Sequence, residues 1–210
     1  MLARIREQQG KPAMPDPREL QTVRAHVAQH PRSPAPRDEW DPLNRFRERA
    51  LSLASTVDEA ESFAHAPARV ADYLRARALP MSAVCWRELL ELDWSGSGID
   101  VESRAARGDD LVGITGACCA IGETGTLVML SGPGTPPSVS LLPETHIALV
   151  RRSSVVRSME DAWSRIRAGQ DALPRAVTFI SGPSRTADIE QTVTLGAHGP
   201  YRVHIIVIAD

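Results

Sequence analysis

Short apolar runs that alternate with amphipathic segments are the feature that most constrains the fold of this chain. The runs are rich in valine, isoleucine, leucine or threonine, end at glycine, proline or charged residues, and are predicted as strands: Ala83–Trp86, Gly125–Leu130, Ser138–Leu142, His146–Val150, Ala176–Ser181 and Val203–Ala209. Strands that are apolar along their length and alternate with helices are typical of a parallel sheet covered on both faces. We therefore expect an α/β domain with a mostly parallel central sheet and helices on both faces.

Helical spacing of apolar residues predicts the helices of this domain. One helix is expected from Leu43 to Ala54, a second over about Glu59–Ala78, and a third from Ser158, whose hydroxyl can cap it. The turn around Pro133–Pro137 leaves one alternative open, because it could join the strands on either side of it as a local hairpin and make the sheet mixed.

Proline divides the chain into two parts. Seven of the 16 prolines lie between Pro12 and Pro42, among Asp, Gln, His and Arg residues. Such a segment buries little apolar surface, so residues 1–42 are predicted as an extended or poorly ordered arm, preceded by one short helix seeded by Leu2 and Ile5. Residues 43–210 are predicted as the α/β domain.

Charge and cysteine content exclude several classes of partner. The formal net charge is -2, which gives no electrostatic reason to expect nucleic acid or an anionic membrane. The apolar stretch Val203–Ala209 is far shorter than the ~20 residues of a membrane-spanning helix. Three cysteines are too few for a disulfide framework, so we expect a cytoplasmic protein.

The first candidate site is a glycine-rich segment, Gly113–Thr126, with a single carboxylate, Glu123. Glycines allow a backbone to approach a ligand closely and to present N–H groups to an anion. The predicted ligand-binding residues around Glu123 are Gly122, Thr124, Gly125 and Thr126. The spacing matches neither G-x-G-x-x-G nor a P-loop, and the alternative is a tight turn into the next strand with a solvated Glu123.

The second candidate site follows the strand that ends near Ser181. Ser184 or Thr186 is expected to cap a helix that runs to about Leu195 and ends at Gly196. The N–H groups at the start of a helix favour an anion, and the side chains of Ser184 and Thr186 would add hydroxyls.

Arg185 is the predicted anion-binding cation of this second segment, because a guanidinium matches carboxylate and phosphate geometry. The alternative is that Arg185 pairs with Asp188 or Glu190 and only braces the loop. Under the functional interpretation, the loops that carry Glu123 and Arg185 meet in one pocket and bind a small anionic ligand.

Histidines and cysteines provide weaker candidates. His146 begins an apolar strand and His198 lies between two glycines, so either is a candidate general base or a hydrogen-bonded structural histidine. Cys118 and Cys119 are adjacent and Cys85 is remote, which is poor spacing for zinc or an iron–sulfur cluster. Buried, inert thiols are the simpler interpretation, and no metal is expected.

At its longest motifs the sequence resembles the LUD-domain family. The segments that carry the resemblance are GDDLVGITGACCAIGETGTLVMLSGPG (Gly108–Gly134), SLLPETHIALV (Ser140–Val150), SMEDAW (Ser158–Trp163) and ISGPSRTADIEQTVTLGAHGPYRVHIIVI (Ile180–Ile208). The resemblance implies a fold similar to that of ribose-5-phosphate isomerase, glucosamine-6-phosphate deaminase and CoA transferases. It also implies a role in L-lactate oxidation to pyruvate beside two partner proteins, at least one of which carries iron–sulfur clusters.

Two functional hypotheses follow. In the first, the chain is a subunit of a lactate-oxidising system and holds no cofactor itself, because it has neither a dinucleotide fingerprint nor a cluster motif. In the second, it is a free-standing enzyme that acts on a phosphorylated sugar or an acyl thioester. Glu123 would then be the base or nucleophile, as in the similar turn of CoA transferases, and Arg185 would hold the anionic group.

Overall fold

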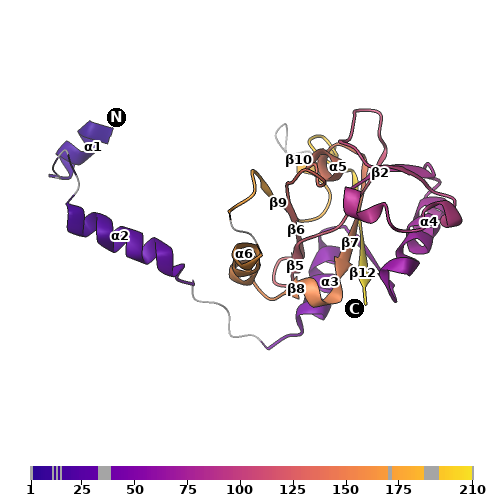
Figure 1. Cartoon of the computed structure of the whole chain (residues 1–210), viewed down its shortest axis with the longest axis horizontal. Coiled ribbons are helices and arrows are strands. Elements are labelled where there is room, and N and C mark those ends of the chain that lie inside the picture. The colour runs from indigo at the N-terminus through magenta and orange to yellow at the C-terminus, as the bar shows by residue number, and fades with distance from the viewer. Residues whose placement is uncertain are drawn as a thin grey trace. The chain divides into compact units, whose positions relative to one another are not determined.

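The computed structural model describes residues 2–10, 12, 14, 16–32, 39–169, 172–186 and 194–209. The chain divides into two compact units, Met1–Asp38 and Glu39–Asp210 (Figure 1). The smaller unit contains α1 (Leu2–Gln8), as predicted, and α2 (Pro17–Gln29).

The helix α2 stands where an extended arm was expected. Asp16 accepts a hydrogen bond from the backbone N–H of Arg18, Pro17 occupies the first turn, and no proline follows until Pro31. Proline stabilises a first turn and disrupts only the interior of a helix, so the segment between these prolines is free to be helical. The prediction of an extended arm was wrong because it rested on the number of prolines and not on their positions.

A six-stranded sheet forms the centre of the larger unit. Its strands, in spatial order, are β1 (Thr56–Ala60), β12 (Arg202–Ile208), β7 (Thr145–Arg151), β4 (Val112–Thr115), β2 (Ser82–Cys85) and β3 (Asp100–Glu102). Every neighbouring pair in this sheet is parallel. The predicted α/β fold with a mostly parallel central sheet is therefore confirmed.

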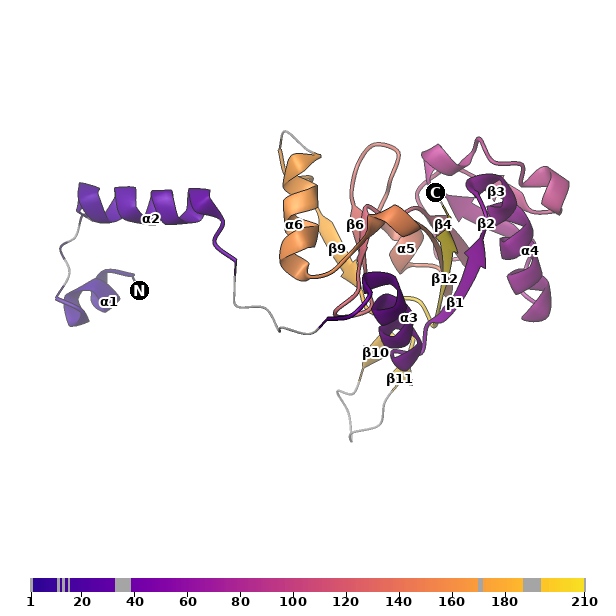
Figure 2. The same ribbon diagram turned by 90° about the horizontal axis from the view of Figure 1, so that it is seen from below.

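Each face of the sheet has its own core. Along β12, Val203 and Ile205 point to one face, and His204 and Ile206 point to the other. The second face is covered by α4 (Ala66–Ala76) (Figure 2) and by the 3-10 segments η1 (Phe63–His65), η2 (Arg87–Leu89) and η3 (Ser95–Ser97). The first face is covered by α3 (Pro42–Ser52), α5 (Ser138–Leu141) and a second sheet.

The second sheet is mixed and has its own helix. Its order is β8 (Val155–Val156), β5 (Cys119–Ile121), β6 (Thr126–Leu130) and β9 (Val177–Ile180), and α6 (Met159–Ala168) packs on its outer surface (Figure 2). Ser158 caps α6 as predicted: its hydroxyl accepts from the N–H of Asp161, whose carboxylate accepts from the N–H of Ser158.

Three expectations for the larger unit differ from the structure. Ser138–Leu142 was expected as a strand but forms the short helix α5, because Pro136 and Pro137 set up a turn whose carbonyls accept from the next N–H groups. The hairpin between this segment and β6 is absent, since β6 pairs with β5 and β9. The helix expected over Glu59–Ala78 begins only at Ala66, because β1 pairs with β12 first.

The helix expected from Ser184 or Thr186 to Leu195 is also wrong at both described ends. β10 (Arg185–Thr186) and β11 (Thr194–Leu195) form an antiparallel ribbon. Gly196 closes the ribbon with a φ of 78° and donates to the carbonyl of Ser184. Residues 187–193, which include Asp188 and Glu190, lie outside the described residues.

Gly113 should be required for the packing of α5 against the sheet. A Cβ at Gly113 would contact the carbonyl oxygen of Val139 and lie 3.0 Å from Cγ of Pro143. We expect Gly113→Ala to lower the free energy of unfolding by about 1–3 kcal/mol, as overpacking in a core does. Gly108→Ala is the matched control, because a Cβ there has no neighbour within 4 Å. Equal melting temperatures for the two variants would contradict this packing argument.

Candidate functional site

A cavity of about 600 Å³ lies at the carboxyl ends of three strands of the parallel sheet. Gly116, Ala117 and Cys118 follow β4, Arg151 is the last residue of β7, and the η2 segment follows β2. The lining residues are Phe63, Glu88, Leu89, Glu91, Leu92, Gly116, Ala117, Cys118, Leu149, Arg151, Ser154 and Arg165. We call this space the carboxyl-edge cavity.

The carboxyl-edge cavity has charges of both signs and an apolar floor. Arg165 of α6 donates from Nη2 to Oγ of Ser154 at 3.0 Å, which holds its guanidinium in place. The guanidinium of Arg151 lies 4.3 Å from the centre of the Phe63 ring, a cation–π contact. Glu88 and Glu91 supply carboxylates. The arginines of the lining can therefore bind an anion, while a glutamate accepts a hydrogen bond from a second polar group of the same ligand.

Cys118 is the half-buried thiol of this cavity. A hydrogen bond from the Cys119 thiol and the nearby charge of Arg165 favour its thiolate, partial burial opposes it, and the pKa of Cys118 is lowered to about 7. The same hydrogen bond and burial raise the pKa of Cys119, which is fully buried in β5. The prediction of buried cysteines is confirmed for Cys85 and Cys119 but is wrong for Cys118, which is half-buried in the cavity lining. Its position in the loop after an apolar strand was the available signal.

The predicted glycine-rich segment is split between two places: Gly116–Cys118 line the carboxyl-edge cavity, whereas the turn around Glu123 lies elsewhere, against α3. The N–H groups of Gly122, Glu123 and Gly125 donate to the carbonyls of Val156, Arg157 and Ile121, respectively. Gly125 has a φ of 68° and its Cα lies against the backbone of α3, where a Cβ would come within 2.6 Å of the N of Ala50. These three N–H groups are therefore used in backbone hydrogen bonds and are not available to an anion. Glu123 is half-buried and Thr124 exposed.

One chain of hydroxyls connects the two predicted site segments. Oγ1 of Thr124 lies 2.7 Å from Oγ1 of Thr126, which lies 2.7 Å from Oγ of Ser181. Arg185 donates from Nη2 to the carbonyl of Leu53, the C-cap of α3, at 3.0 Å. The pocket predicted between Glu123 and Arg185 stays a prediction.

The loop around Ser184 is held mainly by its own backbone. Ser184 donates its N–H to the carbonyl of Pro200, and its hydroxyl accepts from the N–H of His198 at 3.4 Å. His198 is exposed, while Thr186 is half-buried in β10.

His146 lies in the core and lines neither the carboxyl-edge cavity nor the loop around Ser184. It has no exposed area, its Nε2 is 2.8 Å from Oγ1 of Thr115, and its Nδ1 has no partner among the described residues. Burial lowers the pKa of His146 to about 3, so the ring is neutral at physiological pH. A neutral ring between two packed layers fits the structural role that the sequence left open.

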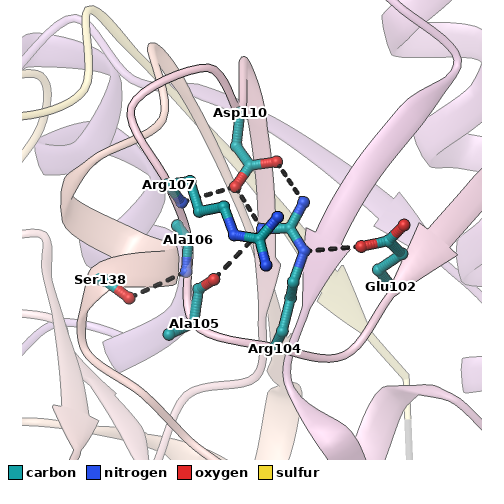
Figure 3. Close-up of polar contacts among 7 residues, drawn as sticks. All are labelled: Glu102, Arg104, Ala105, Ala106, Arg107, Asp110 and Ser138. Atoms are coloured by element: carbon teal, nitrogen blue, oxygen red, sulfur yellow. Dashed lines mark hydrogen bonds and ion pairs between the residues drawn. The ribbon is translucent and has the colours of Figure 1, made fainter.

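The opposite, amino end of the sheet has a smaller cavity of about 230 Å³, where Arg104 is paired with Glu102 and Asp110. Arg104 donates to both carboxylate oxygens of Asp110 and to Glu102 (Figure 3). Asp110 also accepts from the N–H of Arg107, and the Arg104 pair holds the pKa of Asp110 below its usual range. This cluster stabilises the loop before β4, and its three charged groups, Arg104, Asp110 and Glu102, are paired with one another.

The comparison with known families identifies the larger unit. The LUD domain profile matches residues 101–208, which contain the lining residues after β4 and β7 and in α6. The chain belongs to the LUD domain family. Among solved structures, a duf162 family protein from Deinococcus radiodurans is similar, with a TM-score of 0.58 and 24% identity over 80% of this chain and 96% of that one. At this identity the likeness concerns the fold.

Curated relatives of this LUD chain include several called lactate utilization protein C. That of Halalkalibacterium halodurans is 39% identical over 127 residues, 59% of this chain and 54% of the relative. That of Bacillus subtilis is 38% identical over 136 residues, 59% of this chain and 57% of the relative. The chain thus spans about half the length of the curated relatives it matches.

Neither a metal-ion site nor a membrane-spanning helix is found among the described residues. No three His, Cys, Asp or Glu side chains in the described ranges are grouped so that they could hold a metal ion. In the same ranges, no helix combines the length and the apolar character needed to cross a bilayer.

The reactivity of Cys118 should follow its lowered pKa. We expect its alkylation by iodoacetamide to rise between about pH 6 and pH 8 as the thiolate forms, whereas an ordinary cysteine titrates near ~8.5. Cys85 and Cys119 are fully buried and should stay unmodified when each site is quantified by mass spectrometry. Arg165→Ala should move the midpoint for Cys118 upward. A midpoint unchanged from that of free cysteine would contradict the electrostatic argument.

Proposed function

We propose that this LUD-domain chain acts in L-lactate utilization, where its carboxyl-edge cavity binds the carboxylate of a small hydroxy or oxo acid. The observation that carries this proposal is the pair of arginines, Arg151 and Arg165, in a cavity at the carboxyl edge of a parallel sheet. The names of the relatives supply the acid, because several of them are called lactate utilization protein C.

The lining suits a small acid with two polar groups. A guanidinium binds a carboxylate through parallel N–H donors, and Arg165 is already oriented by Ser154. A carboxylate such as Glu88 accepts a hydrogen bond from a hydroxyl on the adjacent carbon. Leu149 and Leu89 offer contact for a methyl group, which completes the three features of lactate.

Electrons would leave lactate through partner proteins under this proposal. Oxidation to pyruvate removes two electrons, and the chain has neither a dinucleotide fingerprint nor the spaced cysteines of a cluster motif. Iron–sulfur oxidoreductase subunits in the cytoplasm are the partners that the family resemblance suggests, so the chain would bind the acid and the partners would accept the electrons.

A dye-reduction assay tests this division of labour. We expect the purified chain not to reduce a redox dye with L-lactate as the electron donor, because its sequence has neither a dinucleotide fingerprint nor a cluster motif. Adding the iron–sulfur proteins of a lactate-utilization system should produce lactate-dependent reduction, and those proteins without this chain are the control. Lactate-dependent reduction by this chain alone would contradict the proposal.

The second candidate function is a free-standing enzyme whose site lies between Glu123 and Arg185. The observation in its favour is the hydrogen bond between Thr126 and Ser181, which joins the two motif segments. A phosphorylated sugar or an acyl thioester would be its substrate, with Glu123 as base or nucleophile and Arg185 on the anionic group.

Two arginine variants distinguish the candidates. Arg165→Ala should weaken L-lactate binding by about tenfold or more in calorimetry, since the loss of one charged contact of about 1.4 kcal/mol is a tenfold change in Kd. Arg185→Ala is the matched control and should change the affinity less than about twofold. Both side chains are solvent-exposed, so neither variant should shift the melting temperature much. The reverse pattern, with binding lost only in Arg185→Ala, would favour the second candidate.

A further inference from the structure

Cys118 faces the proposed acid site but has no part in holding a carboxylate. It lines the carboxyl-edge cavity from the loop after β4, beside Gly116 and Ala117. Cys119, its neighbour in sequence, is buried in β5 on the layer that packs against α6, so only one of the two thiols is available to a ligand in the cavity.

The cavity brings this thiol and a cation into one space. Arg165 lines the same cavity, acts electrostatically on Cys118, and is hydrogen-bonded to Ser154. Both side chains line one cavity of about 600 Å³, so a small acid held there by Arg165 shares that space with the sulfur. The proximity of a bound electrophile and an ionised thiol is the usual requirement for covalent capture.

We propose that Cys118 adds reversibly to the carbonyl carbon of a 2-oxo acid whose carboxylate is held by Arg165. This inference rests on the proposed function and deepens it, because it assigns the oxo acid, the product class of hydroxy-acid oxidation, to the same cavity.

The addition is balanced without an oxidant or a reductant. The sulfur of the thiolate forms a bond to the carbonyl carbon, the π electrons of the C=O bond move to its oxygen, and that oxygen takes one proton from water. The product is a tetrahedral thiohemiketal, and the reverse steps release the oxo acid unchanged. A 2-hydroxy acid has no electrophilic carbonyl at this carbon, so it binds only through its carboxylate and hydroxyl.

The consequence is discrimination between two acids of nearly equal size. Arg165 and the apolar floor contact both acids alike, whereas the carbon–sulfur bond forms with only one of them. The chain would therefore retain the oxidised acid in preference to the reduced one.

Carbon-13 NMR with pyruvate labelled at C2 tests the proposal on the full chain. Wild-type protein should give a new resonance of a tetrahedral carbon, and Cys118→Ser should not. Cys85→Ser is the matched control and should keep the resonance, because Cys85 is buried in β2 away from the cavity lining. Calorimetry should show that the wild type binds pyruvate about tenfold more tightly than L-lactate, a difference of about 1.4 kcal/mol. The Cys118→Ser variant should bind the two acids with equal affinity.

The outcomes separate this inference from the function on which it rests. If both acids bind the wild type with equal affinity and no tetrahedral resonance forms, covalent capture is wrong and acid binding stands. A resonance that persists in Cys118→Ser would assign the adduct to another group and also overturn the inference. If neither acid binds the wild type or the folded Cys118→Ser variant, both the inference and the proposed function are wrong.

Discussion

The pairing of β4, β7 and β12 is the constraint on which the rest of the structure depends. These parallel strands are buried on both faces, so their backbone groups must pair with one another and each face must be covered by apolar side chains. One face takes α4 and the other takes α3, α5 and the second sheet. The close approach of α5 is possible because Gly113 has no side chain.

The amino and carboxyl edges of this sheet differ in how their charged side chains are placed, because different loops connect the strands at each edge. At the amino edge, the loop before β4 returns on itself, and Arg104 is held by Asp110 and Glu102. At the carboxyl edge, the chain leaves β4 and β7 towards the second sheet and α6, which opens a space lined by Arg151 and Arg165. Paired charges stabilise a loop, whereas charges in a cavity can bind a ligand.

Two buried histidines, one on each face of the sheet, belong to its core. His146 lies on one face beside Thr115, and His204 lies on the other beside Thr56 and stacks on Tyr73 with ring centres 3.8 Å apart. Burial lowers the pKa of His146 to about 3 and that of His204 to about 4. Neutral rings cost less to bury than charged ones, so both histidines pack as uncharged side chains.

The sequence by itself predicted the α/β class with a mostly parallel sheet, the capped helix after Ser158 and the family, because apolar runs, capping and long motifs are local patterns. The strands β1, β3 and β4 of that sheet were not predicted, and two predicted strands, β6 and β9, lie in the second sheet. It did not determine that Ser138–Leu142 is helical, since valine and leucine suit a strand and a buried short helix alike. Only the tertiary structure decided the location of the cavity. Cys118, Arg151 and Arg165 come from three separate elements, the loop after β4, the end of β7 and α6, and their convergence depends on which strand ends lie side by side and where α6 packs.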